Sequence, residues 1–230
     1  MTWVQVKLIS SMATREMLAE LAQQFQEMAD CTVAVTSAGG LDVAKRVRQG
    51  EPFDVVVLAD NAIDTLVGAG FLAPGSRTDL VRSGISVAVA LGAPQPDVST
   101  EAALRRAVLA ATSLGFSTGP SGNYLLKLFQ RWGIYGEIQS RLVQPVPGIA
   151  VASLIARGEV ELGFQQLSEL MHMPGIAVLG PLPPAIQSIT TFSAALAVAS
   201  VQPRLARQLI DFLASPHANA PKLRHGMEPA

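Results

Sequence analysis

The chain has 230 residues, of which 49% are hydrophobic, and its 17 basic and 18 acidic side chains leave a formal net charge of −1. This composition is typical of a soluble globular protein built as one large domain or as two lobes of about a hundred residues each. The balanced charge and few aromatics argue against nucleic-acid binding, and the single cysteine, Cys31, excludes an intrachain disulfide and a multi-cysteine metal site.

The amino end, Met1-Thr2-Trp3-Val4-Gln5-Val6-Lys7, leads directly into an apolar run. A secretory leader would show a basic start, a long apolar stretch and a small-residue cleavage site. The sequence as written therefore predicts a cytoplasmic protein, or a periplasmic one if a signal peptide was removed. The sequence holds no apolar run of membrane-spanning length without charges or helix breakers, so we expect no membrane insertion.

Short β-branched runs alternate with segments of helical periodicity, which predicts an α/β fold with largely parallel sheets. The predicted strands are Val4–Ile9, Thr32–Thr36, Val55–Leu58, Ile85–Leu91, Leu114–Phe116, Leu142–Gln144, Gly163–Gln165, Ile176–Leu179 and Thr190–Ala199. The predicted helices are Ala13–Met28, Leu41–Gln49, Ala62–Ala69, Thr100–Ala110, Gly122–Trp132, Ile149–Arg157 and Pro203–Leu213.

Two interruptions of this pattern resemble crossings between lobes. The first is Leu72–Ser83, which contains Pro74-Gly75-Ser76, and the second is the proline-rich Gly180–Pro184. They predict a discontinuous lobe I of residues 1–82 and 184–230 and a lobe II of residues 83–183. A ligand would then bind in the cleft between the lobes, at the carboxyl ends of strands where helices begin.

Four strand-to-helix turns carry hydroxyl residues or glycines. They contain Ser10-Ser11, then Ser37-Ala38-Gly39-Gly40, then Thr118-Gly119-Pro120-Ser121, and finally Val146-Pro147-Gly148-Ile149. Each turn alone is typical of a capped helix, whose first N–H groups need acceptors. The same N–H groups and hydroxyls can hold an anion, so the ordered set predicts an anion-binding cradle.

Other site chemistry is excluded by pattern. The sequence has no phosphate-binding loop ending in Gly-Lys-Ser/Thr, no Gly-x-Ser-x-Gly nucleophile elbow, and no histidine pair at metal-ligand spacing. We therefore expect no metal and no cofactor.

Six segments carry a family resemblance. They are Ser10-Ser11, Ser37-Ala38-Gly39-Gly40, Gly50-Glu51-Pro52-Phe53-Asp54-Val55-Val56-Val57-Leu58-Ala59-Asp60, Gly119-Pro120-Ser121-Gly122-Asn123-Tyr124, Ala156-Arg157-Gly158-Glu159-Val160-Glu161-Leu162-Gly163 and Phe212-Leu213-Ala214-Ser215-Pro216. Through them the chain resembles the solute-binding proteins of the type II periplasmic-binding fold, in particular the molybdate-binding branch. The resemblance covers nearly the whole length and implies a two-lobed α/β fold with mostly parallel sheets.

In that family, serine hydroxyls and backbone N–H groups hold the oxyanion, and a tyrosine hydroxyl completes the site. The tyrosine position here is Gln166, and Arg15 adds a guanidinium suited to a carboxylate. The candidate ligand-binding residues are Ser10, Ser11, Met12, Arg15, Ser37, Ala38, Gly39, Thr118, Gly119, Ser121, Gly148, Ile149 and Gln166.

The branch includes a relative that is an enzyme, aconitate isomerase. The resemblance, together with Arg15, Gln166 and the missing leader, favours a cofactor-free isomerase that moves an allylic proton between trans- and cis-aconitate. Glu169 and His172 are the candidate catalytic groups, although a packed structural role for His172 is an equal alternative, and Asp42 is interpreted as a first-turn acid.

Two other functions stay open. One is a molybdate- or tungstate-type solute receptor that delivers its ligand to an ABC transporter permease, and the other is a cytoplasmic ligand sensor that contacts another protein. The two remaining histidines, His217 and His225, lie in the tail, where we expect them to be solvent-exposed.

Overall fold

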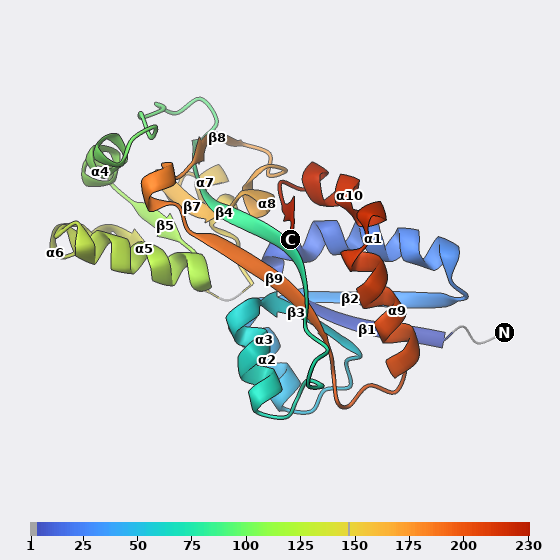
Figure 1. Ribbon diagram of the computed structural model, residues 1–230. Helices are drawn as coiled ribbons and strands as arrows, with labels where there is room; N and C mark the ends of the chain where they lie inside the picture. Colours follow the sequence, from blue (N-terminus) through green and yellow to red (C-terminus); the bar gives the residue numbers. More distant parts are fainter. Residues whose placement is uncertain (1–3, 147) are drawn as a thin grey trace. The chain divides into compact units, whose positions relative to one another are not determined.

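The structure is a computed structural model that describes residues 4–146 and 148–230. It divides into two compact units (Figure 1). Unit 1 contains the chain up to Arg82 and again from Thr191, and unit 2 contains Ser83–Thr190. Both boundaries fall inside strands, because the chain leaves unit 1 within β4 (Thr78–Ala90) and returns within β9 (Ile189–Leu196).

Unit 1 is a mixed sheet in which β1 pairs in parallel with both β2 and β3. Its other strands run antiparallel, β9 against β3 and β10 against the first half of β4. The elements that lie wholly in this unit are β1 (Val4–Ser11), η1 (Met12–Thr14), α1 (Arg15–Met28), β2 (Cys31–Ala38), α2 (Gly40–Arg48), β3 (Val55–Ala59), α3 (Asp60–Gly68), α9 (Pro203–Ala214), η4 (Pro216–Ala218), α10 (Asn219–Arg224) and β10 (Glu228–Pro229).

Helices cover both faces of this sheet, with α1, α9 and α10 on one face and α2 and α3 on the other (Figure 1). The central strand β3 is buried along its whole length, as expected of a strand between two helix layers. Because side chains alternate between faces, Val55 and Val57 join the core with α1, while Val56 and Leu58 join the core with α2 and α3.

Unit 2 is built in the same way around β5, which pairs in parallel with β6 and β7, while β4 runs antiparallel to β7 and β8. Its own elements are α4 (Glu101–Ala110), β5 (Leu114–Phe116), α5 (Pro120–Arg131), α6 (Tyr135–Ile138), η2 (Gln139–Arg141), β6 (Leu142–Val143), α7 (Val151–Ala156), β7 (Leu162–Gln166), α8 (Leu167–Leu170), β8 (Ile176–Pro181) and η3 (Pro184–Ile186).

Two cores lie on the faces of the unit 2 sheet. Leu162 and Phe164 of β7 belong to the larger core, which includes residues of α4, α5 and α6. On the other face, α7 packs so closely against β7 that a Cβ at Gly163 would lie 2.4 Å from Ile155 Cδ1. A glycine in the middle of β7 is therefore required by the approach of α7.

The predicted α/β fold class is confirmed, and each predicted strand overlaps an observed one. The prediction that both sheets are mostly parallel holds for their centres, whereas the crossing strands β4 and β9 add antiparallel pairs. The first boundary between the units follows Arg82, where the sequence pattern places it. The second boundary follows Thr190 in β9, whereas the sequence pattern places the second crossing at Gly180–Pro184. The proline-rich segment instead ends β8 and enters the short helix η3 within unit 2.

Candidate functional site

Two serines meet at the carboxyl ends of β1 and β2. The parallel register pairs Ser10 with Ser37 and Ser11 with Ala38, so the predicted first and second turns are neighbours in unit 1. The Ser10 and Ser37 hydroxyl oxygens are 2.8 Å apart, and the Ser10 hydroxyl is also 3.2 Å from the carbonyl oxygen of Ser11. Ser10 is fully buried, which fixes this pair against the sheet.

The Ser11 hydroxyl is buried without a hydrogen-bond partner among the described residues. Ser11 is 8% exposed and stands at the N-cap of η1, yet its side chain makes no capping bond. A buried hydroxyl without a partner costs free energy comparable to a lost hydrogen bond. Ser11 ends β1 directly after Ser10, and a ligand oxygen at this turn would supply the missing partner.

The other predicted residues of these two turns are partly buried. Met12 is the first residue of η1, and Ala38 ends β2. Gly39 is the N-cap of α2 and makes no side-chain cap, since it has no side chain, and the first N–H bond into the helix is from Val43 to its carbonyl oxygen at 2.9 Å. The N–H groups of the first turn of α2 are thus left for solvent or for an anion.

Arg15 is the first residue of α1, and its side chain is 53% exposed. Its guanidinium is paired with Glu16, with Nε at 2.8 Å and a terminal nitrogen at 2.7 Å from Oε1. In this structure Arg15 thus pairs with a neighbouring acid, and a contact with a ligand carboxylate stays a prediction.

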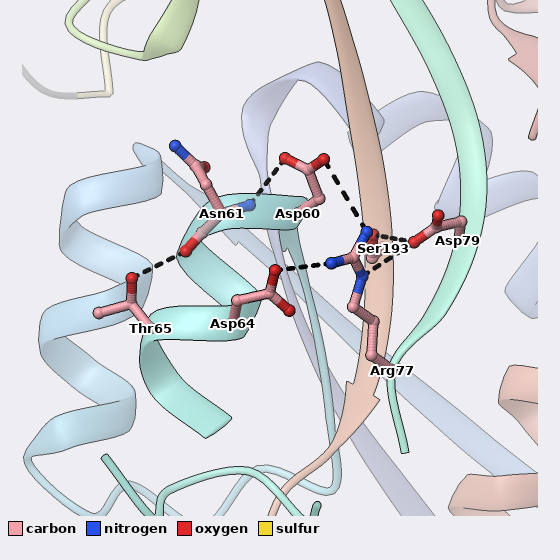
Figure 2. Close-up of polar contacts among 7 residues, drawn as sticks. All are labelled: Asp60, Asn61, Asp64, Thr65, Arg77, Asp79 and Ser193. Atoms are coloured by element: carbon pink, nitrogen blue, oxygen red, sulfur yellow. Dashed lines mark hydrogen bonds and ion pairs between the residues drawn. The ribbon is translucent and has the colours of Figure 1, made fainter. Parts of the chain in front are cut away.

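The turn from β3 to α3 in unit 1 carries an ion-pair cluster that the sequence analysis missed (Figure 2). Arg77, just before β4, contacts the carboxylates of Asp60 at 3.9 Å, Asp64 at 2.7 Å and Asp79 at 3.0 Å. The Ser193 hydroxyl donates to Asp79 at 2.6 Å, and this bond with that from Arg77 lowers the pKa of Asp79. The cluster therefore joins α3 to β4 and β9, and its acids are occupied by the arginine.

The turn from β5 to α5 in unit 2 repeats the serine pairing. The hydroxyls of Ser117 and Ser121 are 2.9 Å apart, and the Gly119 N–H lies 3.4 Å from the Ser117 hydroxyl. Thr118 is partly buried in the same turn. As in α2, a glycine stands at the N-cap of α5 and no side chain caps the helix.

The fourth predicted turn leads from β6 into α7. Gly148 and Ile149 are exposed, Ile149 to 44%, and Pro147 lies outside the described residues. The backbone N–H of Ala152, in the first turn of α7, donates to the Gln165 side chain at 3.1 Å. This glutamine, which the sequence analysis did not single out, fills the role of a helix cap from a neighbouring strand.

Gln166 is 3% exposed at the end of β7, and its amide bonds to groups of its own unit. In the orientation that satisfies both ends of the amide, nitrogen lies 2.8 Å from the Ser83 hydroxyl and 3.0 Å from the Gly84 carbonyl oxygen, and oxygen accepts from the Thr190 hydroxyl at 3.2 Å. Gln166 thus ties the end of β7 to β4 and β9 beside the two unit boundaries. We give it a supporting role, and a direct ligand contact stays a prediction.

The two predicted catalytic residues lie at or just after α8. Glu169 is partly buried and accepts a hydrogen bond of 2.8 Å from Gln165, while His172 is exposed in the turn after the helix. Asp42 lies in the first turn of α2, as predicted.

The expectation for the tail is wrong at His225. Its side chain is only 16% exposed, and its Nε2 lies 2.8 Å from the Glu20 carboxylate, because α10 packs against α1. His217 is exposed, as expected. Among residues 4–146 and 148–230, no cluster of acids, histidines or cysteines could hold a metal ion, and no helix is long and apolar enough to cross a membrane.

Comparisons with known proteins agree with this fold. Residues 6–228 match the family model of bacterial extracellular solute-binding proteins. An aconitate isomerase of a Pseudomonas species is 38% identical over 188 residues, which is 81% of this chain and 71% of that protein.

Two solved structures resemble the chain in fold alone. The periplasmic molybdate-binding protein of Azotobacter vinelandii superposes with a TM-score of 0.81 at 21% identity, covering 96% of this chain and 98% of that one. A tungstate-binding protein of Desulfovibrio alaskensis gives 0.70 at 17% identity and covers 99% of both chains.

Proposed function

This chain belongs to the bacterial extracellular solute-binding protein family, and we propose that it is a cofactor-free isomerase that interconverts trans- and cis-aconitate. The identity of 38% with an aconitate isomerase over 81% of the chain supports the reaction. The observation that carries the anion site is the buried Ser11 hydroxyl, which has no partner among the described residues and follows Ser10 at the end of β1.

The proposed reaction is an allylic proton shift and needs no oxidant or reductant. A base removes a proton from the methylene arm of the substrate, and the electron pair of that C–H bond delocalises into a dienolate. A proton then adds to the CH carbon of the original double bond, which becomes the new methylene carbon, and the double bond moves by one position. Stabilisation of the dienolate requires hydrogen-bond donors at the carboxylate that gains charge.

The unit 1 turns supply such donors. A carboxylate at this edge of the sheet would accept from the Ser11 hydroxyl, and the Ser37 hydroxyl and the first N–H groups of α2 are further donors at the same strand ends. In unit 2, the turn that holds Thr118 and Ser121 offers a second set of hydroxyl and N–H donors. Glu169 is the proposed base of the reaction.

The test is turnover by the purified protein. Incubation with trans-aconitate is followed by ultraviolet absorbance, and the product is identified by chromatography; in deuterated solvent the product should carry deuterium at the new methylene carbon. Loss of the Ser11 hydroxyl removes one bond to a charged group, so Ser11→Ala should lower kcat/KM by about tenfold or more. Ser140→Ala, an exposed hydroxyl in η2, is the matched control and should keep wild-type kinetics. Absence of both turnover and tricarboxylate binding would refute the proposal.

A second candidate is a molybdate- or tungstate-type solute receptor, favoured by the TM-score of 0.81 with a molybdate-binding protein. A ligand that binds only the folded state raises its thermal stability. Thermal shifts by molybdate or tungstate, with none by tricarboxylates, would select the receptor. The reverse pattern supports the isomerase.

A further inference from the structure

Gln165 lies in β7 and is 2% exposed, so its amide is fixed by what it contacts. Its oxygen accepts the backbone N–H of Ala152 at 3.1 Å, and its nitrogen donates to Glu169 Oε1 at 2.8 Å. The first bond determines which end of the amide faces Glu169. Because the oxygen is held by a backbone donor, the NH₂ group must face the carboxylate.

We propose that Gln165 is a positioning residue that orients Glu169 and keeps it ionised, so that Glu169 can act as the base for the allylic proton. This inference rests on the proposed isomerase function. A donor to a carboxylate favours its charged form, which is the form that accepts a proton. The same bond limits the carboxylate to one rotamer, which a proton transfer at a defined carbon needs.

The elements of unit 2 that pack against α8 supply polar groups and no charged side chain of their own. The helix α8 packs against β7 and β8, and neither strand carries a charged side chain. The helix α7, whose backbone holds Gln165, has none either. The nearest titratable group along the chain is His172, in the turn that follows α8. Gln165 thus gives Glu169 a neutral hydrogen-bond donor from within unit 2.

Proton balance is simple in this scheme. Glu169 takes the proton from the methylene carbon, the C–H electron pair enters the dienolate, and the proton is delivered to the other arm of the substrate from Glu169 or from water. Nothing is oxidised or reduced, and Gln165 keeps its own protons throughout.

The first test compares Gln165→Leu with wild type. Loss of the donor disfavours the ionised carboxylate, so the acid limb of the pH profile of kcat/KM should move to higher pH by about one unit. Gln187→Leu is the matched control, because the Gln187 amide bonds to backbone groups of the same unit and has no bond to Glu169 among the described contacts. This control should leave the acid limb in place.

A second variant tests the same role in case Gln165→Leu does not fold. Gln165→Glu keeps an acceptor for the Ala152 N–H but sets a carboxylate against Glu169, so the acid limb should move up at least as far as in Gln165→Leu. Carbon-13 NMR titration of the glutamate carboxyls, assigned with Glu169→Gln, reads the same change in the resting protein, independently of turnover.

The outcomes separate the two proposals. An active Gln165→Leu protein with the wild-type pH profile and an unchanged Glu169 titration would overturn the positioning role and leave the isomerase intact. A wild-type protein without turnover would overturn the isomerase, and with it the role of Glu169 as base.

Discussion

Replacement of Gly122 by alanine should be among the most disruptive small changes in unit 2. Gly122 lies in the first turn of α5, and a Cβ there would stand 1.8 Å from the Ser117 carbonyl oxygen, 2.9 Å from the Ser117 carbonyl carbon and 3.1 Å from Phe116 Cδ2. The nearest atom belongs to the backbone, so no side-chain rotation can relieve the contact. The Ser117 carbonyl also accepts from Gln144 at 3.2 Å, which holds the turn in place.

The size of the effect follows from these distances. Because real Cβ atoms essentially never lie within 3.0 Å of such a neighbour, the turn after β5 must retreat from α5 by more than about 1 Å. A forced backbone shift in a packed region costs about 3 kcal/mol of unfolding free energy, which at this chain length lowers Tm by roughly 6–12 °C. The displaced turn carries the Ser117–Ser121 pair, so anion binding should weaken as well.

The assay is denaturant unfolding of Gly122→Ala beside Gly136→Ala, with Tm as a second readout. Gly136 lies in α6, and a Cβ there meets nothing within 4 Å, so alanine should be neutral or stabilising by up to about 1 kcal/mol through its higher helix propensity. Equal stability of the two variants would show that the contact between α5 and the Ser117 carbonyl is looser than described and would refute the reasoning.

Three further outcomes are expected. Asp54→Asn should cost about 3 kcal/mol of unfolding free energy in urea. The buried carboxylate accepts from the Lys7 N–H at one oxygen and from the Val201 N–H at the other, so the amide NH₂ of asparagine would face a donor. Unchanged stability would contradict this. Gln166→Leu should cost a similar amount, about 3 kcal/mol of unfolding free energy, because the Ser83 hydroxyl and carbonyl, the Gly84 carbonyl and the Thr190 hydroxyl would lose their partner; faster hydrogen exchange in β4 and β9 is the expected signature. Desolvation raises the pKa of Glu20, but the hydrogen bonds from Arg224 and His225 lower it more, so its net pKa is below the ordinary 4.5. The stability that the ionised Glu20 adds is therefore present above pH 4.5 and is lost as the pH falls. Glu20→Gln should make the unfolding free energy depend less on pH on the acid side.

Periodicity was sufficient to predict most elements of the fold, because their burial repeats along the chain. Where burial does not repeat regularly, the sequence did not predict the bounds of an element or the exposure of a side chain. The strand β4 begins at Thr78 and not at Ile85, since Asp79, Arg82 and Gly84 break its apolar pattern while its backbone still pairs. Lys222 is another case, because a basic residue in a polar tail predicts exposure, yet it is 2% exposed and this burial lowers its pKa.

The sequence predicted the turns of the candidate site but not the hydrogen bonds and ion pairs between its side chains. The spacing of Ser10 and Ser37 places both at strand ends, and the sheet register then brings them together. No local pattern shows that Gln165 reaches Glu169 or that Arg77 gathers three aspartates, because those contacts depend on how α7 and α3 pack. Hydrogen bonds between distant segments are set by tertiary packing, which a single sequence does not display.

The Ser10–Ser37 pair has one property that a single serine would lack. Each hydroxyl carries one proton, and the Ser10 proton has two acceptors within reach, the Ser37 oxygen at 2.8 Å and the Ser11 carbonyl at 3.2 Å. If Ser10 donates to Ser37, the Ser37 proton is left to point outward; if Ser10 donates to the carbonyl, the Ser37 proton turns inward and lone pairs face outward. Rotation of two O–H bonds thus reverses the polarity that the turn presents, without movement of any heavy atom. A surface of this kind can follow a ligand whose charge migrates during reaction.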